Sequence, residues 1–187
     1  MKQAKLFGED KEAKVLTQLE LLKVETLVKQ IEGLIKPLCE KLEVVGSIRR
    51  QRATVGDIDF VVIANEINWN KIAKVLKKSN LICAGKSVIK LNYPCENNFF
   101  QCDFYRAAQH TFGIQLLIRT GSADHNMWLA GYAISKGFRL KYSEGLLKDD
   151  VAVAGESEES VFGALGLPCS RAEEREIVNG KPVWLKT

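Results

Sequence analysis

Residues 43–63 read EVVGSIRRQRATVGDIDFVVI, a pattern that predicts a strand, a polar turn and a second strand. The first apolar run ends at Gly46, a loop with three arginines follows, and Gly56 opens the second run. Because side chains alternate across a strand, Asp57 and Asp59 are predicted on one face and their apolar neighbours on the other. Two carboxylates therefore converge at the start of the second strand.

Two carboxylates held this close are costly unless a cation lies between them, so the Asp57-x-Asp59 pattern suggests a divalent-ion site. Mg2+ suits it, because this ion binds through a few carboxylates together with substrate phosphates. The turn at Gly46 and Ser47 and the guanidinium of Arg50 suit a triphosphate. An exposed edge strand followed by a solvated basic loop is the alternative, and Asp-x-Asp by itself would favour it.

Length, composition and net charge limit the classes of protein to which this chain can belong. The chain has 187 residues, of which 46% are hydrophobic and 27% charged, enough for one domain or two small ones. Five cysteines without CxxC spacing and two histidines make a zinc site or a disulfide framework unexpected. A formal net charge of +4 permits a nucleic-acid partner without requiring one.

Targeting signals are not apparent. No apolar run approaches the roughly 20 residues that cross a bilayer, and residues 1–14 lack the apolar core of a signal peptide. We expect no membrane partner and a cytoplasmic, nucleoid or nuclear protein that is not secreted.

Apolar residues at steps of three and four predict a helix from about residue 14 that packs on the core and ends at Pro37. A second helix is predicted near residues 69–76, with lysines on its other side that either contact a phosphate backbone or form a solvated face. Residues 79–86 are predicted as a connection, 87–93 as a strand and 94–98 as a turn. The first helix's stripe comprises Val24, Leu27, Val28, Ile31, Leu34, Ile35 and Leu38.

A third carboxylate occurs in residues 98–107, NFFQCDFYRA. The alternation predicts a strand with an aromatic-rich face and a second face that carries Asp103. Further on, residues 120–137 read TGSADHNMWLAGYAISKG, which predicts a helix capped by Ser122 and ended at Gly137. Two short strands are predicted within 138–147, and a turn plus helix capped by Ser157 within 154–168.

Residues 46–62, GSIRRQRATVGDIDFVV, resemble the nucleotidyltransferase signature of the family X DNA polymerases, the DNA polymerase β-like group, in its G-S-x-R-R and G-D-x-D form. Residues 120–137 resemble the T-G-S segment and helix of that family's small C-terminal subdomain. The resemblance implies an α+β fold: a nucleotidyltransferase palm, with a mixed sheet backed by helices, over residues 1–110. A small α+β thumb subdomain would follow over residues 111–187.

The resemblance also implies roles for the acids. Asp57 and Asp59 would bridge two Mg2+ ions, with Mn2+ able to substitute, and Asp103 would bind the catalytic ion and help to activate the attacking hydroxyl. Asn126 would contact the base of the incoming nucleotide. The residues implied to bind the nucleotide are Gly46, Ser47, Arg50, Gly56, Gly121, Ser122 and Asn126.

By this resemblance the chain is a DNA-directed DNA polymerase. It would add dNMP from a dNTP to a primer 3′-hydroxyl by a two-metal mechanism and fill short gaps in DNA repair. The sequence begins at the palm's first helix, so we expect no lyase domain and a partner protein that supplies DNA binding.

Several positions depart from the family pattern. Ile118 and Arg119 replace an aromatic pair before the T-G-S segment, Ala130 replaces an arginine on the template side, and Gln101 replaces one on the primer side. Because of these losses, a second interpretation remains, in which the protein is a template-independent terminal or small-substrate nucleotidyltransferase. A non-enzymatic nucleic-acid-binding module is a third interpretation, against which the three acids argue.

Overall fold

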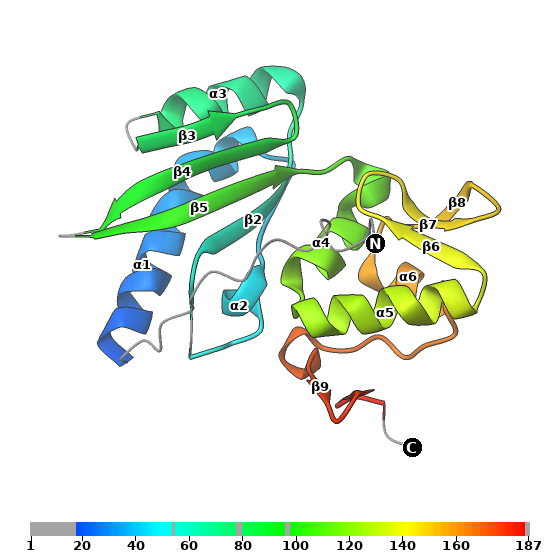
Figure 1. Ribbon diagram of the computed structural model, residues 1–187. Coiled ribbons are helices and arrows are strands. Elements are labelled where there is room, and N and C mark those ends of the chain that lie inside the picture. The colour runs from blue at the N-terminus through cyan, green and yellow to red at the C-terminus, as the bar shows by residue number, and fades with distance from the viewer. Residues whose placement is uncertain (1–17, 54, 78–79, 96–97, 186–187) are drawn as a thin grey trace.

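The computed structural model describes residues 18–53, 55–77, 80–95 and 98–185. It confirms the predicted α+β class, with a mixed five-stranded sheet backed by helices and a smaller helix-rich part that carries a three-stranded sheet (Figure 1). The predicted start of the first helix, near residue 14, lies outside the described residues.

The five-stranded sheet has the order β1-β2-β5-β4-β3. β2 and β5 run parallel, whereas the other three pairs are antiparallel. The parallel pair at the centre brings the 43–63 and 98–107 segments side by side. The strands are β1 Lys41–Val44, β2 Ile58–Ile63, β3 Asn80–Ala84, β4 Val88–Cys95 and β5 Asn98–Arg106.

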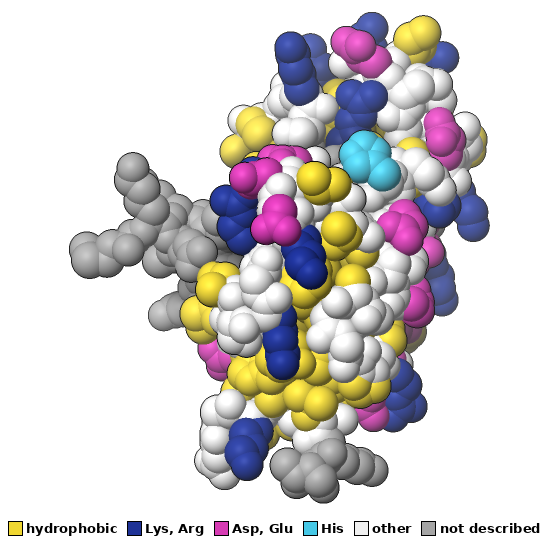
Figure 2. All heavy atoms as spheres, turned by 90° about the vertical axis from the view of Figure 1, so that its right-hand side faces the viewer, with side chains coloured by type: hydrophobic (Ala, Val, Ile, Leu, Met, Phe, Trp, Pro, Cys, Tyr) yellow, Lys and Arg dark blue, Asp and Glu magenta, His cyan; other side chains and the backbone are white. Residues whose placement is uncertain are grey.

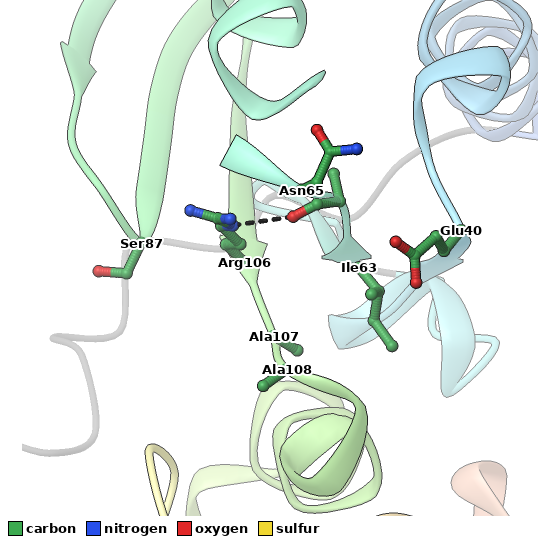
Figure 3. A pocket seen from close by; sticks show the side chains of 8 residues that line it. Glu40, Ile63, Asn65, Ser87, Arg106, Ala107 and Ala108 are labelled. Atoms are coloured by element: carbon green, nitrogen blue, oxygen red, sulfur yellow. Dashed lines mark hydrogen bonds between the residues drawn. The ribbon is translucent and has the colours of Figure 1, made fainter. Parts of the chain in front are cut away.

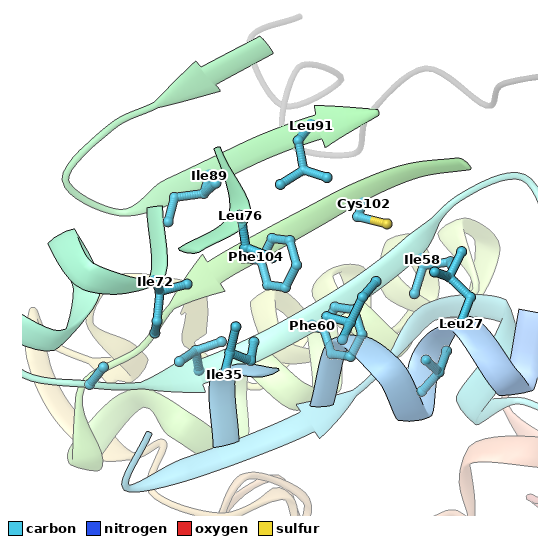
Figure 4. Packing of buried hydrophobic residues seen from close by; sticks show 14 of the residues in the cluster. Leu27, Ile35, Ile58, Phe60, Ile72, Leu76, Ile89, Leu91, Cys102 and Phe104 are labelled. Carbon is cyan, nitrogen blue, oxygen red and sulfur yellow. The ribbon is translucent and has the colours of Figure 1, made fainter. Parts of the chain in front are cut away.

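One face of this sheet is covered by α1 (Gln18–Ile35) and α3 (Glu66–Leu76), which bury the main hydrophobic core (Figures 1 and 4). Phe60 and Phe104, partners in the parallel register, stack with ring centroids 5.0 Å apart. Such a pair stabilises by roughly 0.5–1.5 kcal/mol beyond its area. This core fixes which residues of β2 and β5 must face the other way.

The ends of the two helices follow from local chemistry. α1 ends before η1 (Lys36–Leu38), which contains Pro37, so the predicted stop is confirmed. Leu34 is 47% exposed, and its assignment to the apolar stripe was therefore wrong. Asn65 caps α3 by accepting a hydrogen bond from the Asn68 backbone, so this helix begins before the predicted residue 69.

Two connections predicted on the way to Asp103 have other bounds in the structure. Residues 80–84 form the edge strand β3, which pairs only with β4 and has mostly exposed side chains. An edge strand without a buried face has no alternating pattern to reveal it. Pro94 lies within β4 and is not part of a turn, and residues 96–97 lie outside the described part.

The second face of the sheet is divided between packing and polar side chains. Toward one end Val61, Ile63 and Ala107 pack with Phe112 of α4 (Phe112–Thr120). This contact attaches the C-terminal part to the sheet and leaves the end that carries Asp59 to polar residues.

The C-terminal part packs α4, α5 and α6 against a three-stranded sheet of order β6-β7-β8. Ser122 and Ser157 cap their helices as predicted, and Gly137 follows α5 with a φ of +79°. Strand β8 was not predicted. The elements are α5 Ala123–Ser135, β6 Phe138–Lys141, β7 Gly145–Lys148, β8 Val151–Ala154 and α6 Glu158–Ala164, with η2 Gln109–Thr111, η3 Ala172–Glu174, β9 Ile177–Val178 and β10 Lys181–Pro182.

The surface of this C-terminal part is mixed in charge. Figure 2 shows basic and acidic side chains interspersed over the face that lies on the right in Figure 1, with hydrophobic side chains gathered toward its lower part. Among the described residues, no helix combines the length and the apolar character that crossing a membrane would need.

Candidate active site

Asp59 and Asp103 lie directly side by side, because they are partners in the parallel register of β2 and β5. Their neighbours Ile58, Phe60, Cys102 and Phe104 are fully buried on the opposite face. The core therefore forces both carboxylates onto the polar face of the sheet. Asp57 precedes β2 by one residue and is half-buried, like Asp59. The predicted clustering of the two strands' acids is thus present.

The carboxylates repel one another. Burial, followed by the negative charges of Asp57 and Asp103, raises the pKa of Asp59 from 3.8 to about 7. The positive charges of Arg119 and Lys90 offset part of this rise. Burial and the neighbouring carboxylates together thus disfavour the ionised form of Asp59.

Asp103 is held by three donors. Its carboxylate pairs with the ammonium of Lys90 and accepts hydrogen bonds from Gln101 Nε2, at 2.8 Å, and from the Tyr105 hydroxyl, at 3.2 Å. Its side chain is only 3% exposed. These contacts fix the orientation of the carboxylate at the centre of β5.

Gly46 allows the preceding loop to approach Asp59. A Cβ at Gly46 would lie 2.8 Å from Asp59 Oδ2, and the φ of Gly46 is +68°, a backbone region that favours glycine. The predicted polar turn here was wrong in form: Gly46–Arg49 make the short helix α2. Ser47 and Arg49 therefore lie on a helical turn whose start contacts the acidic site.

The arginines that follow α2 contact the C-terminal part. Arg50 donates to the Thr120 carbonyl, and its Nε lies 3.5 Å from Glu176 Oε1. Arg52 Nε donates to the same Glu176 oxygen at 3.0 Å. Arg50 Nε is buried and has no hydrogen-bond partner, and burial is the main cause of the lowered pKa of Arg50. A phosphate chain at Arg50 would therefore have to replace Glu176.

Arg49 joins a buried ion-pair cluster with Glu158 and Arg175. The guanidinium of Arg49 forms two hydrogen bonds of 2.8 Å to Glu158, and Arg175, 1% exposed, adds a third at 2.7 Å. Burial would raise the pKa of Glu158, but these hydrogen bonds and charges lower it below its ordinary value. The cluster ties α2 to the start of α6.

The segment predicted to bind the nucleotide, residues 121–126, is held by contacts within the protein. The Gly121-Ser122 peptide is cis, and the Ser122 hydroxyl donates to the Arg175 carbonyl at 3.1 Å. Asn126 Nδ2 donates to the Ile118 carbonyl at 2.7 Å, whereas Oδ1 is buried without a partner. Gly121 lies against Arg50, since a Cβ there would be 3.2 Å from Arg50 Nη1. The structure thus brings Gly121, Ser122 and Asn126 to the side of Arg50. Gly56 is exposed just before Asp57.

Four residues that contact this site were not predicted from the sequence to do so. Lys90, Tyr105 and Glu176 had no assigned role, and Arg119 was noted only as a departure from the family pattern. The Arg119 guanidinium stacks on the Tyr105 ring at 3.7 Å and thereby joins α4 to β5. A strand's alternation could have put Tyr105 on the face of Asp103, but the partners from other elements gave no local signal.

The residues present fit a magnesium ion that is completed by substrate. Within the described parts of the chain, no three carboxylate, histidine or cysteine side chains lie close enough to hold a metal by themselves. Mg2+ binds through one or two carboxylates plus phosphate oxygens and water. The adjacent carboxylates of Asp59 and Asp103, and the Gly46 backbone that leaves room for the Asp59 carboxylate, are compatible with such an ion.

A separate pocket of about 320 Å3 lies at the opposite end of β2 and β5 from Asp59 (Figure 3). Arg106 lines it, with its Nε donating to the Ala64 carbonyl at 3.0 Å, and Glu40 faces it from the β1 side. None of the acids of the candidate site lines this pocket. The carboxylate site is a polar face of the sheet, distinct from this hollow.

Comparison with known families bears on the C-terminal part. Residues 115–176 match the family model of the DNA polymerase beta thumb. The match covers α4 from Gln115 onward, α5, the three-stranded sheet and α6, and it supports a relationship to the DNA polymerase β-like proteins. A search of curated proteins found no match.

Proposed function

We propose that this protein is a nucleotidyltransferase of the family X DNA polymerase type, which adds dNMP from a dNTP to a primer 3′-hydroxyl and fills short gaps in DNA repair. The single observation that carries the proposal is the pairing of Asp59 with Asp103 on adjacent parallel strands, in a chain with a DNA polymerase beta thumb match. Residues 1–110 would act as the palm and 111–187 as the thumb.

Asp57 and Asp59 would hold both of two Mg2+ ions, or Mn2+ in their place, and Asp103 would hold the catalytic one. Bound there, the ions would neutralise charge on the attacking hydroxyl and on the triphosphate. The protein's own contribution is positioning. Asp103, fixed by Gln101 and Tyr105, takes up the proton of the primer hydroxyl.

The nucleotide would bind between α2 and the start of α5. Ser47, Arg50 and the Gly46 and Gly56 backbones contact the phosphates, and Arg50 exchanges Glu176 for a phosphate oxygen. Gly121 and Ser122, next to Arg50, would also contact the nucleotide. Asn126, whose side-chain amide lies beside Gly121, would contact the base.

Template-independent addition is the second candidate, and one feature favours it. Helix α5 contains no lysine or arginine, and its exposed residues include Met127, Gly131 and Ile134. A helix of this composition offers a templating strand no cationic side chain, and most of the affinity for a phosphate backbone comes from such side chains. If the protein instead fills gaps, a partner protein would supply the DNA binding that α5 lacks.

Incubation with Mg2+, labelled primer and each dNTP separates the candidates, using one-nucleotide-gapped, blunt and single-stranded DNA. Gap filling predicts incorporation of the template-matched nucleotide on gapped DNA at least tenfold faster than on single strands. Equal, unselective addition on single strands would favour the terminal transferase. The absence of incorporation on every DNA, with the protein folded, would contradict both enzymatic candidates and favour a non-enzymatic binding module.

A further inference from the structure

Lys90 and Asp103 are direct cross-strand partners in the antiparallel register of β4 and β5. The neighbours of Lys90, Ile89 and Leu91, are fully buried against the helices on the other face. Lys90 must therefore project from the same face as Asp103. Its ammonium pairs with Asp103 Oδ2.

The Asp103 carboxylate has little acceptor capacity left. An ionised carboxylate offers about four lone-pair positions, and Lys90, Gln101 and Tyr105 fill three of them. Gln101 and Tyr105 are neutral donors, whereas Lys90 carries a full charge. A cation that approaches this carboxylate thus meets another cation.

We propose that Lys90 is a positioning residue that competes with a divalent cation for Asp103. The inference rests on the proposed function, in which Asp103 is a metal ligand. Lys90 and Tyr105 both donate to Oδ2, so the open position is on Oδ1. A divalent ion bound there lies close to the Lys90 ammonium, and the repulsion between the two cations favours a Lys90 side chain that turns away. The Lys90 side chain is 37% exposed and has a flexible four-carbon stem, so it can do so.

The competition has two consequences. In the metal-free protein Lys90 compensates the charge of a carboxylate that is 3% exposed. In the metal-bound protein the ion at Asp103 competes with that pair, so it binds more weakly than an ion held by Asp57 and Asp59. Lys90 thus sets the concentration of metal at which Asp103 becomes engaged.

A purely structural role for Lys90 predicts a different result from competition. If Lys90 only supported the sheet, its neutralisation would leave metal affinity unchanged or would weaken it through local disorder. Competition predicts the opposite sign, namely tighter binding when the charge is removed. The sign of the change in metal affinity therefore decides between the two.

The experiment is a Mn2+ titration of the full chain with a non-hydrolysable dNTP analogue, whose phosphates complete the coordination, corrected by a titration of the analogue alone and followed by electron paramagnetic resonance of the free ion. The variants are Lys90→Gln, Lys90→Met, which keeps the aliphatic stem, and Lys90→Arg, which keeps the charge. Lys74→Gln, an exposed lysine of α3 on the opposite side of the sheet, is the matched control. Circular dichroism verifies that each variant is folded.

We expect two classes of Mn2+ site, of which the weaker tightens at least fivefold in Lys90→Gln and Lys90→Met. The stronger class stays unchanged, and Lys90→Arg and Lys74→Gln match the wild type. Unchanged or weaker Mn2+ binding in folded Lys90→Gln and Lys90→Met would overturn this inference but leave the proposed metal site standing. The absence of Mn2+ binding in every protein, wild type included, would overturn the proposed metal site and this inference with it.

Discussion

Asp59 and Asp103 are nearest neighbours across two parallel strands. The residues that follow them in sequence, Phe60 and Phe104, are fully buried on the other face of the sheet. The core thus holds two like charges together, although their repulsion opposes folding. The repulsion between the two carboxylates should lower the free energy of unfolding of the metal-free protein, and this effect can be measured without an activity assay.

Asp59→Asn is expected to stabilise the metal-free protein at pH 7.5. The raised pKa of Asp59, about 7 against 3.8 in the unfolded chain, means that the unfolded state loses its proton first. Stability from this group is therefore present below pH 4 and lost as the pH rises toward 7. Urea unfolding should show a gain of roughly 1–4 kcal/mol at pH 7.5 and almost none at pH 4.

Asp124→Asn, at an exposed position in the first turn of α5, is the control and should show no such gain. An Asp59→Asn protein that is less stable than the wild type at pH 7.5 would contradict the electrostatic account.

His125→Leu is expected to flatten the loss of stability in acid. His125 is fully buried beside Phe162 and Trp184, and neither ring nitrogen has a partner. Burial, aided by the charge of Arg175, lowers its pKa from 6.5 to about 4. The unfolded state therefore binds a proton first as the pH falls from 6.5 to 4, which costs the wild type on the order of 3 kcal/mol.

Denaturant unfolding of the wild type and of His125→Leu at pH 7 and pH 4.5 measures how much stability each protein loses in acid. Asp59 contributes equally to both proteins, so its opposite pH dependence cancels when the two losses are subtracted. His110→Gln, at an exposed histidine, should keep the wild-type pH profile. Equal acid sensitivity of His125→Leu and wild type would refute the role given to His125.

Glu158→Ala is expected to destabilise strongly. The carboxylate of Glu158 is the partner of Arg175, which is 1% exposed, and of Arg49. Removing it leaves a buried guanidinium unpaired, at a cost of about 3 kcal/mol or more. Arg49→Ala should cost less, because the Arg49 side chain is 27% exposed and Arg175 still neutralises Glu158. Urea midpoints in the reverse order would contradict the assignment.

Gly113→Ala and Gly163→Ala should have opposite effects on stability, although both glycines lie in helices. A Cβ at Gly113 would overlap the Ser157 backbone, whereas a Cβ at Gly163 meets nothing within 4 Å. We expect a loss of about 1–3 kcal/mol for Gly113→Ala from the forced displacement of α4 and α6. Gly163→Ala should gain up to about 1 kcal/mol by restricting the unfolded chain. Similar melting temperatures for the two variants would argue against the close helix contact.

The alternation of buried and polar residues was sufficient to predict the central strands and the convergence of their acids. Ile58, Phe60, Cys102 and Phe104 alternate with carboxylates because one face of the sheet is covered by helices. The caps at Ser122 and Ser157 were predictable for a similar reason, since a hydroxyl before a helix satisfies its first backbone donors.

The remainder could not be predicted because it depends on partners that are distant in sequence. Arg50 and Arg52 pair with Glu176, and Arg119 stacks on Tyr105, contacts that no local pattern encodes. Strand β3 gave no signal because its side chains are mostly exposed, and the short β8 escaped for the same reason.

The most direct test of the central claim is single-turnover incorporation of a template-matched dNMP on gapped DNA in Mg2+, comparing wild type with Asp103→Asn and Asp124→Asn. We expect that Asp103→Asn lowers the rate at least a thousandfold while nucleotide binding persists, and that Asp124→Asn matches the wild type. An Asp103→Asn protein that retains the wild-type rate would contradict the assignment of this carboxylate pair as the active site.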